Sequence, residues 1–431
     1  MRTWTLALAI SVLGCSGGYP DPKPDRPTAP TANDPAFTSR GLESWYLIGD
    51  GATPGEDRMV FVITAPSGTD FVDAYIPGMA PLRMISQDDG FALDISIADL
   101  EAGAHEVLFS ANGSDDAFAK ATLNSSAAYY VLVTTDYDFS DPGKLSIGYM
   151  NKMHMDHPAM VITHFWAPYT YTDPEVTDAR RDELTTWIKE VHDTYGDEIG
   201  LHIHPWCNFV QAAGVTCVTD QSTVYTMDES GYTINLTAYG HDLMGQLLQY
   251  AATLFGQRGL GTPTSFRAGG WTADENTLLA LSDNGYVADS SALNWKYIEE
   301  WEGKELYTWN MTHWAPIDDT SQPYYPSTTD PLTSSPGANV ATLELPDNGV
   351  MIDYVSTDEM TAIFDANWDG APLATPTTLV MGFHPSTSFS DGEYRRVNDL
   401  LKLADMHLAK SDLGPVVYMS LSDVTAAFPA Q

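Results

Sequence analysis

From Tyr129 to the end of the chain, short apolar runs alternate with amphipathic segments of helical length. This alternation constrains the fold more than any other feature, because it is typical of parallel sheets covered by helices. The expected strands span residues 130–134, 160–165, 198–203, 264–267, 350–354, 377–383 and 416–419, and the expected helices span about 175–195, 240–257, 273–284, 357–367 and 393–410. We predict an α/β fold with a (β/α) barrel, either complete or distorted and incomplete. A doubly wound open sheet is the alternative, although no G-x-G-x-x-G follows an early strand.

Three of the expected helices begin with the pattern of a capping box. A Ser or Thr is followed three positions later by Glu in Thr272 with Glu275, Ser356 with Glu359, and Ser390 with Glu393. Each pair is expected to satisfy free N–H groups at a helix start.

The chain before Tyr129 has a different texture. Alternating runs such as 59–63, 91–95 and 105–109 are separated by Gly, Pro and Asp turns, which predicts a small Ig-like β-sandwich over residues 37–128. It carries no convergent set of catalytic side chains, so a spacer, docking or sugar-binding module is the expectation. Residues 129–431 would then form the barrel domain.

The N-terminus is typical of a targeting segment over residues 1–15. Arg2 precedes an apolar run over residues 4–13, and Leu13-Gly14-Cys15 resembles the cleavage site of a bacterial lipoprotein, in which the cysteine is lipidated. An ordinary secretory peptide is the alternative. Residues 16–36 are rich in Pro, Asp and Gly, which predicts an extended tether. We expect an exported protein, lipid-anchored at the bacterial cell envelope, or secreted if Cys15 is not lipidated.

The charge of the chain limits its partners. Lys and Arg number 20 against 58 Asp and Glu, a net charge of −38. Such a field repels nucleic acid and anionic lipid headgroups, so no nucleic-acid partner is expected, and membrane contact is expected through the lipid anchor alone.

Two cysteines remain once Cys15 is assigned to the anchor. Cys207 and Cys217 form an even pair separated by a short loop, and we expect a disulfide between them in an oxidising compartment. The alternative is a pair of buried thiols too far apart to bridge.

Polar residues that end apolar runs are the candidates for chemistry, because the carboxyl ends of parallel strands meet at one mouth of a barrel. Two aspartates and two histidines occur at strand spacing, so each pair can point the same way. Five segments carry such residues: Asp136 and Asp138 after 131–135; His202 and His204 in 199–206; Arg267 in 265–271; His384 in 379–385; and His164 in 161–165. Arg267 could equally be a surface residue at a strand-to-helix turn, and His164 could be a core histidine.

Together these segments resemble the polysaccharide deacetylase family, the NodB-like carbohydrate esterases, over roughly residues 129–428. Residues 134–138 take the place of the family's Thr-Phe-Asp-Asp segment, and 200–206 that of its paired-histidine segment. Residues 266–271, with the following 275–278 and 285–291, look like the arginine motif, its helix and the next strand. Residues 383–385 look like the late histidine motif.

The resemblance implies a carbohydrate deacetylase, a hydrolase that removes acetyl groups from an acetylated polysaccharide or amino sugar with one divalent metal, for which Zn2+ is expected. Asp136 would be the general base and His384 the general acid, with Arg267 orienting the base. Asp138, His202 and His204 would bind the metal.

The spacing departs from the family in two places. Tyr137 separates aspartates that are usually adjacent, and the histidines are two apart rather than four, with Trp206 at the fourth position. Either the coordination is rearranged, with His164 as a further ligand, or the metal is lost. The stretch 151–157, which contains His154 and His157, could also approach the site or form a solvated loop.

Two further functions stay open. One is a non-catalytic surface lipoprotein that binds carbohydrate or a protein partner through a degenerate barrel, and the other is a metal hydrolase acting on amides other than acetyl. Aromatic residues near the mouth could stack on sugar rings, Trp206 and Trp271 above all, or could belong to the core. The set is Trp166, Tyr169, Tyr171, Trp206, Trp271 and Trp295.

Overall fold

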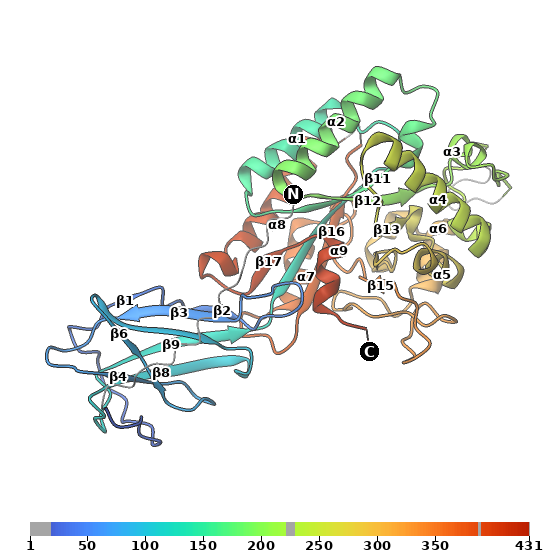
Figure 1. The fold of residues 1–431 in the computed structure, drawn as a ribbon. Coiled ribbons are helices and arrows are strands. Elements are labelled where there is room, and N and C mark those ends of the chain that lie inside the picture. The colour runs from blue at the N-terminus through green and yellow to red at the C-terminus, as the bar shows by residue number, and fades with distance from the viewer. Residues whose placement is uncertain (1–18, 221–228, 387–388, 431) are drawn as a thin grey trace. The chain divides into compact units, whose positions relative to one another are not determined.

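The structure is a computed structural model that describes residues 19–220, 229–386 and 389–430. Residues 1–15, the predicted signal segment with Cys15, lie outside this range. The chain divides into two compact units (Figure 1). The first contains residues up to 43, 58–100 and 104–123; the second contains 44–57, 101–103 and 124 onward.

Two small sheets make up the first unit. The pairs β1–β3, β3–β7 and β6–β7 are antiparallel, as are β4–β5 and β4–β8. The strands are β1 (Ser39–Arg40), β3 (Arg58–Ile63), β4 (Val72–Tyr75), β5 (Leu82–Arg83), β6 (Ile85–Gln87), β7 (Gly90–Ser96), β8 (Gly103–Ala111) and β9 (Ala119–Ser126). Burial alternates along β3, and Phe61 meets Phe109 of β8 edge to face with ring centroids 5.9 Å apart. Apolar side chains therefore fill the space between the sheets, as the alternating runs predicted.

The described part of the predicted tether, residues 19–36, makes backbone hydrogen bonds to residues 115–118 of the first unit. Thr28 donates its N–H to the Asp115 carbonyl at 2.8 Å, and the Thr28 carbonyl accepts from Ala117 at 3.0 Å. Asp34 donates to Phe118 at 2.8 Å. Pro30, which lies between these residues, lacks an N–H group, but Thr28 and Asp34 keep theirs and pair with the 115–118 loop.

The second unit is built on a sheet of eight strands whose neighbours pair in parallel. Its order is β15-β14-β13-β12-β11-β10-β16, and β17 also pairs with β10. The strands are β10 (Tyr129–Asp136), β11 (Ile162–Trp166), β12 (Glu198–Ile203), β13 (Ser265–Ala268), β14 (Ala288–Asp289), β15 (Leu343–Glu344), β16 (Thr377–Phe383) and β17 (Val416–Tyr418). The short β2 (Trp45–Leu47) pairs with residues 124–126. All eight residues of β10 are buried, as expected of a parallel strand covered on both faces.

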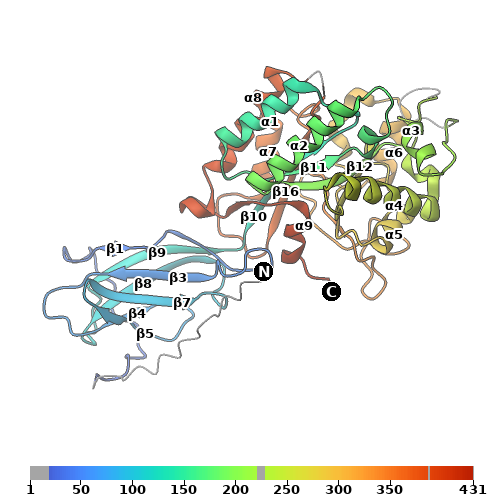
Figure 2. The same ribbon diagram turned by 45° about the horizontal axis from the view of Figure 1, so that its top comes forward.

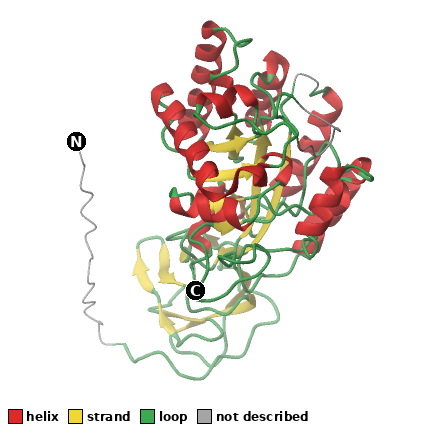
Figure 3. Cartoon of the chain, turned by 90° about the vertical axis from the view of Figure 1, so that its right-hand side faces the viewer, coloured by secondary structure: helices red, strands yellow, loops and turns green. Residues whose placement is uncertain are grey.

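Helices cover the outside of this sheet (Figure 3). They are α1 (Gly143–Asp156), α2 (Asp178–Tyr195), α3 (Cys207–Ala212), α4 (Gly240–Arg258), α5 (Glu275–Asp283), α6 (Glu305–His313), α7 (Thr357–Asn367), α8 (Asp391–Asp405) and α9 (Leu421–Val424). In Figures 1 and 2, α1 and α2 run side by side over β11 and β12. The strand–helix alternation confirms the predicted α/β fold, and no helix in the described ranges has the length and apolarity required to cross a bilayer.

The barrel is incomplete between β15 and β16, where no pairing joins the two strands. The predicted strand 350–354 was wrong: only Met351 forms a bridge, to Gly382 of β16. Val350 has a φ of 62°, which turns the backbone out of the extended conformation. Residues 350–352 are nevertheless buried. A continuous apolar run indicates burial, but by itself it does not indicate a strand.

The helix starts were predicted correctly at two of three positions. Capping boxes form at Ser356 and Ser390, but α5 is capped by Asp274, whose carboxylate accepts from the Thr277 N–H at 2.9 Å. Thr272 instead donates its hydroxyl to Gly269. The sequence also gave no signal for α1, because exposed apolar residues such as Leu145 and Met155 blur its periodicity.

Candidate active site

Side chains from the ends of β10, β12 and β16 converge on one small cavity of about 170 Å³. Asp136 is the last residue of β10 and His202 belongs to β12. The cavity is also lined by three residues that follow strand ends: Asp138 after β10, His204 after β12 and His384 after β16. The carboxyl ends of the strands thus bring together most of the residues that the strand-end pattern selected, though not His164.

Three of these side chains form a compact group of possible metal ligands. One ligand atom each from Asp138, His202 and His204 lie within 4.8 Å of one another. Oδ1 of Asp138 is 3.2 Å from Nε2 of His202 and 3.3 Å from Nε2 of His204. The two-residue spacing of His202 and His204 therefore brings both imidazoles to Asp138, because alternate residues of extended backbone face the same side.

The hydrogen bonds of the two imidazoles fit a metal ion. Nδ1 of His202 donates to the Arg267 carbonyl at 2.9 Å, and Nδ1 of His204 donates to the Tyr232 carbonyl at 3.0 Å. A neutral imidazole that donates through Nδ1 presents a lone pair at Nε2. Nε2 of His204 is buried and makes no hydrogen bond. Two lone pairs and a carboxylate oxygen thus point at one place, an arrangement that a divalent cation satisfies.

Asp138 is ready to act as an anionic ligand. Burial raises the pKa of its carboxyl, but the nearby imidazoles of His384, His204 and His202 outweigh this effect and hold the pKa well below its usual range. Tyr232 donates its hydroxyl to Oδ2 at 2.9 Å, and the Trp206 indole donates to the Asp138 carbonyl oxygen at 3.0 Å. Burial and the charge of Asp138 raise the pKa of the Tyr232 phenol, so it remains a donor.

Asp136 is held by a fully buried guanidinium. Nη1 of Arg267 lies 3.0 Å from Oδ1 of Asp136 and 2.9 Å from the hydroxyl of Thr134. The other nitrogens donate to the carbonyl and hydroxyl of Ser290, and Nη2 lies 3.5 Å from Asp347. With no exposed surface, Arg267 is a fixed anchor for the carboxylate rather than a surface residue.

His384 lies beside the three-ligand group and is paired with a second carboxylate, that of Asp353. Its Nδ1 donates to Oδ2 of Asp353 at 2.7 Å, while its Nε2 is 3.8 Å from Oδ1 of Asp138. Burial lowers the pKa of the imidazole, but the charges of Asp138 and Asp353 raise it more, to about 10. The ring is therefore protonated at neutral pH and can donate a proton into the cavity.

Several residues of the site were missed from the sequence, among them Asp353, Asp347 and Tyr232. Asp353 ends the apolar run 350–352, so the pattern that selected the other strand ends could have found it. Asp347 accepts the Trp271 indole N–H at 2.9 Å, and burial raises its pKa to about 6. Asp347 lies in a Pro-Asp-Asn-Gly turn and Tyr232 in a loop, and neither place carries a periodic signal.

The structure places His164 away from the three-ligand group. Its Nδ1 bonds to the hydroxyls of Thr135 at 2.9 Å and Tyr137 at 3.0 Å, and its Nε2 is 3.0 Å from Asp197. It is fully buried, as a core histidine would be. His154 and His157 belong to α1 and its C-cap, not to a solvated loop, and pair with Asp197 and Asp405.

The aromatic residues near the mouth have different environments. Trp166, Tyr169 and Tyr171 are buried in the core, and Trp295 packs against the core partly buried. Trp271 lines the small cavity but is almost fully buried. Trp206 is half-buried and stacks on Tyr232 with ring centroids 4.9 Å apart. It also lines a second cavity of about 800 Å³, which shares Phe139 with the small one.

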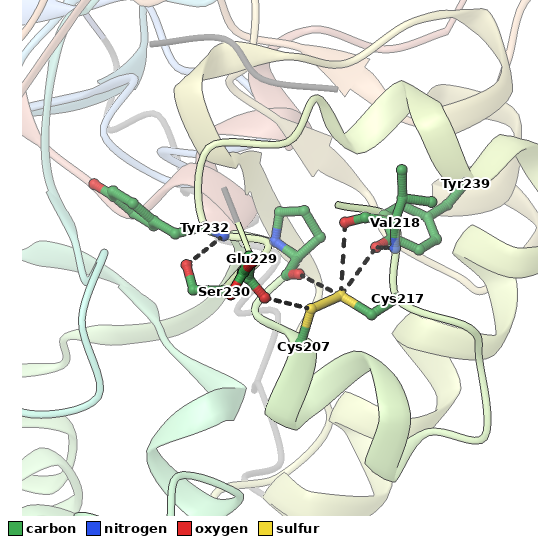
Figure 4. Close-up of a disulfide and its surroundings, with 8 residues drawn as sticks. Cys207, Cys217, Val218, Glu229, Ser230, Tyr232 and Tyr239 are labelled. Carbon is green, nitrogen blue, oxygen red and sulfur yellow. Dashed lines mark hydrogen bonds between the residues drawn. A yellow bond between two sulfur atoms is a disulfide. The ribbon is translucent and has the colours of Figure 1, made fainter. Parts of the chain in front are cut away.

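The predicted disulfide is confirmed. Cys207 and Cys217 are bonded, with Cα atoms 5.2 Å apart, directly after the His204–Trp206 segment (Figure 4). The bridge closes a loop at the edge of the site.

Fold and site together define a parallel (β/α) protein with a candidate metal centre at the carboxyl ends of its strands. Neither a family model nor a curated protein sequence matches the chain. Solved structures do match it at low identity. A protein from Mycobacterium smegmatis provisionally named a polysaccharide deacetylase has 14% identity and a TM-score of 0.41, over 69% of this chain and 88% of its own.

A family 4 carbohydrate esterase from Streptomyces lividans, solved in complex with acetate, has 11% identity and a TM-score of 0.35, over 70% of this chain and 96% of its own. A 4-alpha-glucanotransferase from Thermococcus litoralis has 9% identity and a TM-score of 0.38, over 70% of this chain and 40% of its own. The matching structures thus include polysaccharide deacetylases and carbohydrate esterases, the family that the strand-end motifs resemble.

Proposed function

We propose that the chain is a metal-dependent hydrolase that removes acetyl groups from an acetylated polysaccharide or amino sugar. One observation carries the proposal: a three-ligand Asp–His–His group, a carboxylate bonded to Arg267 and a histidine paired with Asp353 surround a single cavity. Acyl hydrolysis needs these three components, namely an electrophilic centre, a base and an acid.

The metal ligands would be Asp138, His202 and His204. A divalent ion held there supplies Lewis acidity and lowers the pKa of water toward about 7. Zn2+ is the expected ion, because two imidazoles and one carboxylate form a common catalytic zinc set.

The proton transfers fall to Asp136 and His384. Arg267 bonds Oδ1 of Asp136, so Oδ2 is the oxygen available to take a proton from the attacking water. His384 carries the proton that the leaving nitrogen or oxygen requires, and Asp353 stabilises the imidazolium between turnovers. The buried cation Arg267 lies beside the base Asp136, whereas the anion Asp353 lies beside the acid His384.

A small acyl group suits the cavity. A volume of about 170 Å³ is well below the roughly 300 Å³ at which pockets for drug-sized ligands begin. Trp271, Trp301 and Tyr354 contribute aromatic surface to its wall. The carbohydrate part of the proposal comes from the order of the motifs along the chain, which resembles that of the polysaccharide deacetylases.

We further propose that the protein is exported and anchored by a lipid on Cys15 at a bacterial cell envelope. The Leu13-Gly14-Cys15 sequence supports the anchor, and the Cys207–Cys217 disulfide suits an oxidising compartment. Mass spectrometry of the mature N-terminal peptide tests this: a diacylglyceryl group on Cys15 is expected, and a mature N-terminus elsewhere contradicts it.

Acetate release from a panel of N- and O-acetylated glycans, assayed with Zn2+ present, tests the activity. Wild type should release acetate from at least one glycan, and Asp136→Asn should slow release by about 10²- to 10⁴-fold without loss of metal. Asp358→Asn, an exposed carboxylate at the start of α7, is the matched control. If a metal-loaded wild type releases no acetate, the carbohydrate-binding lipoprotein becomes the better reading.

A further inference from the structure

Tyr232 touches the three-ligand group in three ways, although it belongs to none of the barrel strands. Its hydroxyl donates to Oδ2 of Asp138 at 2.9 Å. Its carbonyl oxygen accepts from Nδ1 of His204 at 3.0 Å. Its ring lies against the His204 ring, with centroids 4.5 Å apart. One loop residue therefore contacts two of the three candidate ligands.

The hydroxyl determines which carboxylate oxygen faces the histidines. Oδ1 of Asp138 lies 3.2 Å from His202 and 3.3 Å from His204, while Oδ2 is occupied by the tyrosine. A carboxylate without this bond could rotate about its Cβ–Cγ bond and present both oxygens. Tyr232 thus restricts Asp138 to ligation through one oxygen, which leaves a coordination position open for water and substrate.

The ring and the carbonyl orient the second histidine. Because the Tyr232 carbonyl takes the Nδ1 proton, the lone pair of His204 is fixed at Nε2, the atom that faces Asp138. The Tyr232 ring stacks in turn on Trp206 and lies against Phe139, with the Tyr232 and Phe139 ring centroids 5.3 Å apart. These contacts leave little freedom to tilt the imidazole.

The disulfide holds the backbone of this loop in place (Figure 4). Cys207 donates its N–H to the Ser230 carbonyl at 2.7 Å. Gly231 has a φ of 83°, and a Cβ there would lie 2.4 Å from the Pro205 carbonyl oxygen and 3.1 Å from both sulfur atoms. The loop is packed so closely on the bridge that only glycine fits, and this fixes the position of the next residue, Tyr232.

We infer that Tyr232 is a positioning residue of the metal centre, which sets Asp138 for one-oxygen ligation and fixes His204 in the tautomer that binds metal. This inference rests on the proposed metal-dependent function. It assigns a role to a residue outside the strand-end motifs, and it explains how the loop closed by Cys207 and Cys217 contributes to the site.

The test is metal affinity, measured by titrating the metal-free, disulfide-bonded protein with Co2+ against a competing chelator. Tyr232→Phe keeps the ring and the backbone carbonyl and removes only the hydroxyl. It should weaken Co2+ binding by about 10-fold or more, the usual effect of removing a partner of a metal ligand. It should also change the visible absorption of the Co2+-loaded protein, because a freed carboxylate alters the coordination.

Tyr239→Phe is the matched control. Tyr239 is also buried beside the disulfide, and its hydroxyl accepts from the Val218 N–H at 3.1 Å without touching the ligands. It should bind Co2+ within about 2-fold of wild type. Thermal unfolding of each metal-free variant verifies that affinity is compared between folded proteins.

The outcomes separate the inference from the function. If wild type binds Co2+ and Tyr232→Phe binds it with the same affinity, the positioning role alone is overturned. If only Tyr232→Ala loses Co2+ affinity, Tyr232 acts through packing. Wild type that binds no Co2+ overturns the metal-dependent function, and the inference with it.

Discussion

The second unit contains two clusters of one aspartate and two histidines, one of which opens to a cavity. The carboxylate of Asp138 lies beside His202 and His204, and that of Asp197 lies beside His154 and His164. In both, one carboxylate oxygen lies near two imidazole Nε2 atoms, at 3.2 and 3.3 Å in the first and at 2.8 and 3.0 Å in the second. Residue types and local geometry are therefore nearly the same.

What differs is whether the cluster opens to a cavity. In each cluster the second carboxylate oxygen also has a donor, the Ile162 N–H at 2.9 Å for Asp197 and the Tyr232 hydroxyl at 2.9 Å for Asp138, so the clusters differ in exposure rather than in bonding. The Asp197 side chain has no exposed surface, whereas that of Asp138 is 17% exposed and lines the small cavity. A closed cluster contributes to stability, and an open one can bind a ligand.

Matched substitutions of one histidine in each cluster should have the largest effects, on metal binding in the open cluster and on unfolding free energy in the closed one. His202→Gln removes a metal ligand and should abolish stoichiometric Zn2+ binding and acetate release, while the protein stays folded. His164→Gln should retain both and lose about 1 to 3 kcal/mol of unfolding free energy, because buried groups lose partners. Metal analysis and urea denaturation measure the two properties. A His164→Gln protein without metal would break the comparison.

The fold was largely predictable because its signals are local. The runs that became β10, β12 and β16, and the helices α2, α4 and α7, lie within a few residues of their predicted positions. Periodicity could not show β14 and β15, because each has only two residues. Nor could it show that the chain at Val350 turns beside β16, since positive φ at a buried valine follows from the surrounding packing.

The site was predictable where its residues end strands, and the rest was not. Asp136, Arg267 and His384 meet because parallel strands share a direction. The sequence could not distinguish His164 from His202, because both lie in apolar runs and differ only in where their second nitrogen points. Tyr232 reaches Asp138 across 94 positions of sequence, and that contact exists only in the folded chain.

Removing the carboxylate of the closed cluster should cost the most stability. Asp197→Ala leaves two histidines and a backbone N–H without their partner, which should lower the unfolding free energy by about 3 to 5 kcal/mol. Burial raises the pKa of Asp197, but the hydrogen bonds from the histidines lower it more, so the net shift is downward. Its contribution is therefore present above the unfolded pKa of about 3.9 and lost as pH falls through the folded pKa.

Denaturation of wild type and Asp197→Ala at several pH values measures this contribution. The difference in unfolding free energy should be larger at neutral pH than below pH 4. A difference that does not change with pH would show that Asp197 acts by packing alone. Asp138→Ala is the matched change in the open cluster, and it should cost less stability in the metal-free protein because Asp138 is partly exposed.

In the proposed reaction, His384 beside the open cluster donates a proton, and Asp353→Asn tests whether Asp353 controls the pKa of that histidine. The pKa of His384, about 10, is raised by Asp138 and Asp353, so the acid form is present at neutral pH and lost as pH rises through that value. Removal of the Asp353 charge should lower the pKa and move the alkaline limb of kcat down by about one to three pH units. A pH–rate profile with the limb unmoved would show that Asp353 does not govern the acid.

The smallest effect is expected at Tyr137, the residue that separates the two aspartates and faces the closed cluster. Its hydroxyl bonds Nδ1 of His164 at 3.0 Å, while Asp136 and Asp138 line the small cavity, which Tyr137 does not line. Tyr137→Phe should cost about 1 kcal/mol, because Thr135 still pairs with His164. Metal affinity should be unchanged, since a side chain on the far face of extended backbone does not touch the ligands. A tenfold loss of affinity would show instead that the two clusters act as one network, joined through Tyr137.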